Sequence, residues 1–113
     1  FYPALFYERN EFEDANNHYN CPIVTSYSEN IKNNVEEIAG GEITFRNPFM
    51  SFRDLGTVTD ALTKEFTEIP AAEIAAACVK GWQELANARH DMEKKGEETL
   101  EYLRQTGKRV RTW

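Results

Sequence analysis

The feature that most constrains the fold is a stripe of apolar residues in the last third of the chain. The stripe consists of Ile74, Cys78, Trp82, Leu85, Met92, Leu100 and Leu103. Steps of three and four residues predict one amphipathic helix of more than thirty residues, from Ala71 after Pro70 to a C-cap at Gly107. At 1.5 Å per residue this helix is about 50 Å long, which exceeds the diameter of a compact domain of 113 residues. We therefore expect part of it to extend beyond its own core.

The first half of the chain has the pattern of an α/β protein. Two apolar runs, Phe1–Phe6 and Cys21–Thr25, have the length and composition of short strands. Pro3 restricts the first of them to a strand end or a sheet edge. A polar segment over Tyr7–Asn20 separates the two runs and has no apolar face to bury, so it is expected to be a loop.

A helix and a third strand follow. Ser26 and Glu29 have the spacing of a capping box, which predicts a helix that begins at Ser26 and ends at Gly40. The run Ile43–Phe45 alternates with polar neighbours and stops before Pro48, as a strand would. A strand, helix, strand order is typical of a parallel pair with a crossover helix.

After Pro48 only helical patterns are present. Thr57 and Asp60 form a second possible capping box for a short helix that ends near Thr67. The predicted fold class is α/β: a short, mostly parallel sheet of two to three strands followed by helices, with one long C-terminal helix. This is an incomplete Rossmann-like half-domain, a single fragment with a strand-containing part over 1–48 and a helical part over 49–113.

Composition excludes several classes of function. The net charge is -6 and the basic residues are scattered, so a nucleic-acid partner is not expected. The cluster around Lys108, Arg109 and Arg111 is interpreted as a solvated helix end. There is no apolar run of membrane-spanning length and no signal peptide, and the two cysteines are far apart, so we expect a cytoplasmic protein with reduced thiols.

The usual catalytic motifs, such as phosphate-binding glycine loops and zinc-ligand spacings, are absent from the sequence. Only residues 7–29 gather a thiol, a histidine, carboxylates and amides at an expected strand edge, where α/β proteins bind ligands. Cys21 is either a metal-binding thiolate or a buried residue at a strand start. His18 is either a hydrogen-bonded loop anchor or a ligand or proton donor. Cys78 is expected to fill the core.

Several segments resemble the C-terminal portion of large CoA-substrate-specific enzyme activases, the ATP-dependent activators of 2-hydroxyacyl-CoA dehydratases. The resemblance covers nearly the whole chain. Its segments are Phe1–Pro3, Tyr7–Arg9, Asn17–Tyr27, Ile31–Asn34, Phe45–Pro48, Lys95–Leu103 and Thr106–Lys108.

The resemblance implies a role in electron transfer. The full-length relatives fuse an ATP-hydrolysing module of the actin and Hsp70 type to regions similar to the dehydratase subunits, and cysteine-bound iron–sulfur clusters pass low-potential electrons. Cys21 falls on the family's Asn-Cys-Pro motif and is the implied ligand of a 4Fe–4S cluster in the intact protein. Tyr7, Glu8, His18 and Asn20 would line the cluster pocket, or else pin the loop to neighbouring backbone. A cluster needs three or four thiolates, so the chain alone is expected to hold none and to be no enzyme.

The implied partners are the rest of a parent chain and a 2-hydroxyacyl-CoA dehydratase-like protein. The alternative function is a non-catalytic structural and docking module of a large multidomain protein. The apolar start at Phe1 and the end at Trp113 suggest a piece of a larger protein, and its uncovered surfaces predict a homodimer through antiparallel pairing of the long helices. Relatives often have Pro where this chain has Ser28, which we expect near a helix cap.

Overall fold

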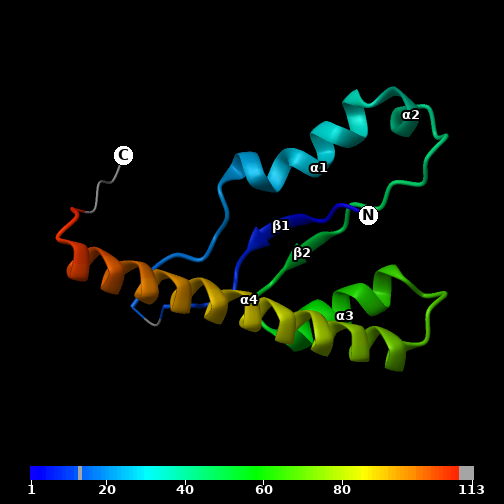
Figure 1. Ribbon diagram of the computed structural model, residues 1–113. Coiled ribbons are helices and arrows are strands. Elements are labelled where there is room, and N and C mark those ends of the chain that lie inside the picture. Colours follow the sequence, from blue (N-terminus) through cyan, green and yellow to red (C-terminus); the bar gives the residue numbers. More distant parts are fainter. Residues whose placement is uncertain (13, 110–113) are drawn as a thin grey trace. The chain divides into compact units, whose positions relative to one another are not determined.

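The computed structural model describes residues 1–12 and 14–109, which contain two strands and four helices (Figure 1). In chain order these are β1 (Ala4–Tyr7), α1 (Pro22–Asn34), α2 (Glu36–Ala39), β2 (Phe49–Ser51), α3 (Leu55–Glu65) and α4 (Ala71–Thr106). The α/β class is confirmed, because a short parallel sheet of two strands is followed by helices, the last of which is long. The chain divides into two compact units, of which the second begins at Val79. Glu13, Arg111 and Trp113 lie outside the described residues.

The sheet consists of β1 and β2, which run parallel. The aligned pairs are Ala4–Phe49, Leu5–Met50 and Tyr7–Ser51, with an irregularity between Leu5 and Tyr7. A backbone bond extends the ladder, since the Ala4 N–H donates to the Pro48 carbonyl at 2.9 Å. Parallel strands need a crossover connection, and α1, which lies within it, packs against β1. The predicted order of strand, crossover helix and parallel strand is found, but it is formed by β1 and β2 and not by the strands expected over Cys21–Thr25 and Ile43–Phe45.

The strand predicted over Cys21–Thr25 is wrong, because α1 begins at Pro22. Proline is well suited to the first helical turn, where its fixed φ fits and its missing N–H has no intrahelical partner to lose. Ser26 therefore lies inside α1, and its hydroxyl donates to the Ile23 carbonyl at 3.0 Å instead of capping the helix. Ser28 also lies inside α1, not near a cap, and it is fully buried.

The strand predicted over Ile43–Phe45 is also wrong. That segment has no regular structure, and the second strand forms after Pro48 instead, at Phe49–Ser51. Pro48 can stand directly before this strand because the ladder uses its carbonyl, which accepts from Ala4, and not the N–H that it lacks. The part of the chain after residue 48 therefore contains a strand as well as helices. Gly40 does follow a helix, but only the short α2, since α1 ends at Asn34.

Arg46 connects the segment before β2 to the C-terminal end of α3 through hydrogen bonds, an ion pair and a cation–π contact. Its Nη1 donates to the Glu65 carbonyl at 3.0 Å, and its Nη2 lies 2.7 Å from the Glu68 carboxylate. The guanidinium also lies over the Phe66 ring, 4.8 Å from the centroid. The last carbonyls of a helix have no intrahelical partners and form the negative end of its dipole, so a cation is favourable there. Arg46 thus fixes the path by which the chain enters the sheet.

The apolar core of the first unit is small. Its buried residues are Ala4, Met50, Val58 and Ile74, which come from β1, β2, α3 and the first turn of α4. Met50 is 2% exposed and is the largest fully buried side chain among the described residues. A small domain has a thin margin of stability, so each of these side chains carries a large share of it.

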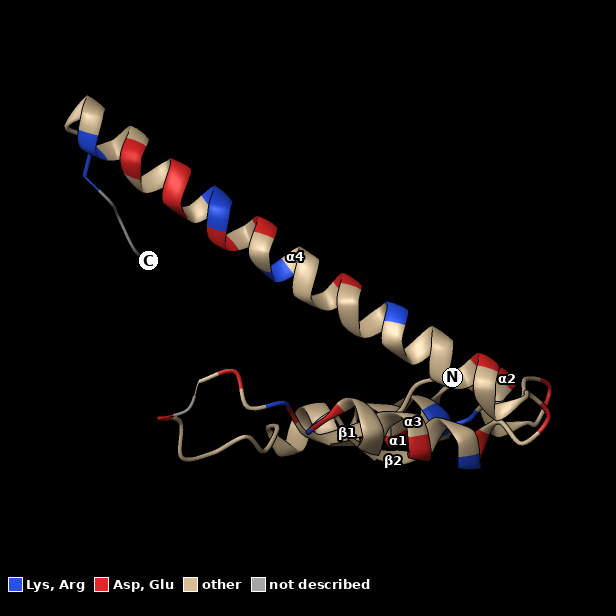
Figure 2. Ribbon diagram, turned by 90° about the horizontal axis from the view of Figure 1, so that it is seen from below, with Lys and Arg blue, Asp and Glu red and all other residues tan. Residues whose placement is uncertain are grey.

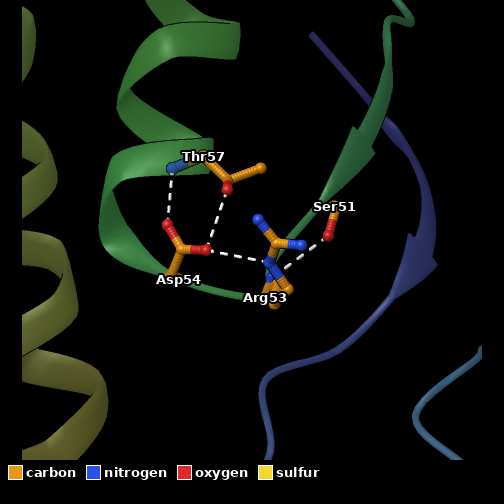
Figure 3. Close-up of polar contacts among 4 residues, drawn as sticks. All are labelled: Ser51, Arg53, Asp54 and Thr57. Atoms are coloured by element: carbon orange, nitrogen blue, oxygen red, sulfur yellow. Dashed lines mark hydrogen bonds and ion pairs between the residues drawn. The ribbon is translucent and has the colours of Figure 1, made fainter.

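The N-terminus of α3 is capped by Asp54, so the predicted capping box of Thr57 and Asp60 is wrong (Figure 3). Asp54 Oδ1 accepts from the Thr57 N–H at 2.8 Å, and Oδ2 accepts from the Thr57 hydroxyl at 2.9 Å. Arg53 Nε donates to Oδ2 at 3.0 Å. These bonds favour the ionised carboxylate, the one from the Thr57 backbone most of all, and lower the pKa of Asp54 from 3.8 to about 2.

This cap predicts a loss of stability in acid. Because folding lowers the pKa of Asp54, its contribution is complete above pH 3.8 and disappears as the pH falls toward about 2. Asn is an equally good N-cap without a charge, so Asp54→Asn should show a smaller fall in Tm than the wild type between about pH 5 and about pH 2. Asp60→Asn, on the same helix outside the cap, is the matched control. Equal falls in Tm for Asp54→Asn and the wild type would contradict the assignment.

The long C-terminal helix is confirmed. α4 covers Ala71–Thr106, 36 residues, and Gly107 ends it in the left-handed region with φ 66°. Gly96 lies within the continuous helix. Acidic and basic residues are both distributed along α4 in Figure 2. Its ion pairs include Arg89–Glu93, Lys95–Glu98 and Arg104–Glu101. Within the described ranges, no helix combines the length and apolarity that crossing a bilayer requires.

Candidate functional site

The candidate site is built around Cys21, which stands at the N-cap position of α1. Its thiol is free and exposed, so the alternative of a buried small residue does not hold for this cysteine. The expected position at a strand tip is wrong, since the residue opens a helix. The Cys21 side chain makes no capping hydrogen bond to the first N–H groups of α1. The positive end of the helix dipole is therefore close to the thiol, and an anion is favoured there.

Asn20 fixes the backbone immediately before the thiol. Its side-chain Nδ2 donates to Glu8 Oε1 at 2.9 Å and to the Leu5 carbonyl at 3.1 Å. Its backbone N–H donates to the Phe6 carbonyl at 2.9 Å. Three bonds to β1 and the residue after it thus hold Asn20 in place, and Cys21 follows directly in the chain.

The two ends of the loop are held together by contacts of Tyr7, Glu8 and His18. The Glu8 N–H donates to the His18 carbonyl at 2.8 Å, and Tyr7 forms an isolated antiparallel bridge with Tyr19. The Tyr7 ring meets His18 edge-on at 5.8 Å between centroids and Tyr19 at 4.9 Å. The structure therefore links four of the five predicted residues in one series of contacts, from Tyr7 to His18, from His18 to Glu8 and from Glu8 to Asn20. These contacts favour the role of loop anchors, which was the alternative to lining a cofactor pocket.

An open groove of about 460 Å³ lies beside the start of α1. It is lined by Phe6, Tyr19, Asn20, Pro22, Thr25, Ser26, Glu29 and Phe49. Phe6 and Phe49 are stacked, with centroids 4.6 Å apart and an angle of 8° between the rings. Asn20 and Pro22, the neighbours of Cys21, belong to this lining, whereas Cys21 does not. The groove is therefore next to the thiol but is not formed by it.

An iron–sulfur cluster needs more ligands than the described residues bring together. Among residues 1–12 and 14–109, no three His, Cys, Asp or Glu side chains lie close enough together to hold a metal ion. The second cysteine, Cys78, is half-buried on α4. A cluster requires three or four thiolates, so the described residues do not fit a complete cluster site and offer one exposed ligand.

One residue that holds the site was missed by the sequence reasoning. The Thr25 hydroxyl donates to the Leu5 carbonyl at 3.2 Å and so ties the first turn of α1 to β1. It is also 3.3 Å from the Cys21 carbonyl, four residues earlier. That spacing is a recognisable signal only for a helix that begins at Pro22, which the apparent strand over Cys21–Thr25 concealed.

Comparison with known proteins gives a family for the chain. The family model described as the CoA enzyme activase uncharacterised domain matches residues 1–111. No curated protein and no solved structure matches the chain. The family match spans almost all of the 113 residues and confirms the resemblance carried by segments such as Asn17–Tyr27 and Phe45–Pro48. The chain belongs to the CoA enzyme activase uncharacterised domain family.

Proposed function

We propose that this domain works in an ATP-dependent activator of the 2-hydroxyacyl-CoA dehydratase type, where it presents Cys21 as one thiolate ligand of an iron–sulfur cluster. The family assignment supports the activator system. The observation that supports the role of Cys21 as a cluster ligand is its free, exposed thiol at the start of α1.

The hydrogen bonds around Cys21 hold its backbone in a fixed position, which favours a metal ligand over a surface thiol without a role. The three hydrogen bonds of Asn20 and the bond from Thr25 to Leu5 hold the backbone on both sides of Cys21. Uncapped N–H groups at the start of α1 favour an anionic group nearby, and both a thiolate and a thiolate-bound cluster are anionic. The other ligands would have to come from polypeptide outside the described residues.

The experiment compares the chain's two cysteines in the intact activator, purified without oxygen. Cys21→Ser should lower the iron content by about one cluster and reduce the visible absorption of the protein. Cys78→Ser, the matched control on α4, should keep both. If the two variants keep the same iron as the wild type, Cys21 is not a ligand and the proposal is wrong.

A second candidate function, a docking module, is favoured by the large apolar side chains that remain exposed. On α1, Ile23 is 62% exposed and Tyr27 is 46% exposed. Under this function Cys21→Ser changes nothing, and the colourless domain still binds a dehydratase-like partner after anaerobic reconstitution with iron and sulfide. A brown domain with thiolate-to-iron absorption would favour the first function instead.

A further inference from the structure

The part of α4 in the second unit carries a stripe that the proposed function does not use. From its positions we define the dyad stripe as Trp82, Leu85, Arg89, Met92, Gly96, Leu100 and Leu103. At 3.6 residues per turn, all seven lie within about 80° of arc on one side of the helix. Three apolar side chains of the stripe are largely exposed to solvent: Leu85 is 45% exposed, Met92 is 70% exposed and Leu100 is 48% exposed.

Such a face is expected to be covered. Most of the stability of a helix in a protein comes from packing its apolar face, not from its intrinsic propensity. The ion pairs Arg89–Glu93 and Lys95–Glu98 contribute little at an exposed helix surface. A helix with a narrow apolar stripe of this kind is typical of helix pairs.

The spacing of the dyad stripe identifies its partner. Read from either end, its members stand at almost the same distances from a centre close to Met92. We propose that a second copy of this chain covers the stripe, with the two α4 helices antiparallel and a twofold axis near Met92. In this arrangement Trp82 lies opposite Leu103 of the second copy, and Leu85 lies opposite Leu100. Both contacts occur twice, as in any interface with twofold symmetry.

Volume and charge favour the antiparallel arrangement over a parallel one. The antiparallel pair places Arg89 opposite Gly96, and among the described residues no atom outside the adjoining helix backbone lies within 4 Å of a Cβ position built on Gly96. The long arginine side chain therefore meets the one position of the stripe without a side chain, and its charge is already paired with Glu93 at 3.0 Å. A parallel pair would place Arg89 opposite Arg89, which is repulsive, and Gly96 opposite Gly96, which leaves a void.

The first test measures the mass of the chain in solution by sedimentation equilibrium. The wild type should be a dimer, and Leu85→Glu should raise the dissociation constant by roughly tenfold or more, because it places a carboxylate in the apolar seam. Asn87→Glu adds the same charge on the opposite side of α4 and should leave the constant unchanged. Leu85→Ala, which keeps the helix without adding charge, should also weaken the dimer. A monomeric wild type, or a dimer indifferent to both Leu85 variants, overturns the inference.

The second test measures the orientation. In a background with Cys21 and Cys78 replaced by Ser, Ala86→Cys and Glu97→Cys are made as separate proteins and mixed under oxidation. Antiparallel helices bring position 86 of one copy near position 97 of the other, so the mixed disulfide should dominate. Parallel helices give only the two symmetric disulfides, and that result would overturn the arrangement. Both tests are independent of iron, so their failure is distinguishable from failure of the Cys21 proposal.

Discussion

Replacing Met50 by alanine is expected to lower the free energy of unfolding by about 2–5 kcal/mol. Met50 lies on β2, is 2% exposed and is opposite Leu5 of β1 in the sheet register. The other buried apolar residues among those described are few, so the neighbours cannot easily collapse into the cavity. Since small domains unfold at a cost of about 5–15 kcal/mol, the variant should lose a large part of its folded population. Urea denaturation followed by circular dichroism measures the change.

Two control variants separate cavity formation from a general effect of mutation. Met50→Leu nearly conserves volume and should cost less than about 1.5 kcal/mol. Ile43→Ala removes an aliphatic side chain that is 52% exposed and should change the stability by less than about 0.5 kcal/mol. A loss of stability in Ile43→Ala as large as that in Met50→Ala would contradict the assignment of Met50 to the core and of Ile43 to the surface.

The long helix could be predicted from sequence because its signal is repeated many times. Apolar residues recur from Ile74 to Leu103 at steps of three or four residues or at two such steps together, and Gly107 ends the helix. The start of α1 could not be predicted in the same way. Ile23, Val24 and Thr25 have strand propensity, but Pro22 at the first helical position and the bond from Thr25 to β1 outweigh it.

The second strand was missed for a different reason. Phe49–Ser51 is only three residues long, too short for a periodic signal, and its position is set by pairing with β1. Pairing between residues more than forty positions apart cannot be seen in a local pattern. The same limit applies to the candidate site, where the motif predicted Asn20 and Cys21 but the bonds from Asn20 to Glu8 and Leu5 depend on how the loop folds back. The further ligands of a cluster would lie outside the described residues altogether.

Ser28 violates a rule that buried polar groups usually obey. It is fully buried in α1, and its hydroxyl has no hydrogen-bond partner among the described residues. Burying an unsatisfied hydroxyl costs about 1–3 kcal/mol. The hydroxyl therefore works against the packing of α1, whereas the Thr25 hydroxyl one turn earlier, which is bonded to Leu5, supports it.

Replacing Ser28 by alanine is accordingly expected to raise the free energy of unfolding by about 1–3 kcal/mol, helped by the higher helix propensity of alanine. Ser26→Ala is the matched control in the same helix. Its hydroxyl is bonded to the Ile23 carbonyl, so the lost bond and the gained propensity should leave a change of under about 1 kcal/mol. Thermal and urea unfolding measure both variants. A lower stability of Ser28→Ala would show that the hydroxyl does find an acceptor, most simply the Val24 carbonyl one turn earlier in α1.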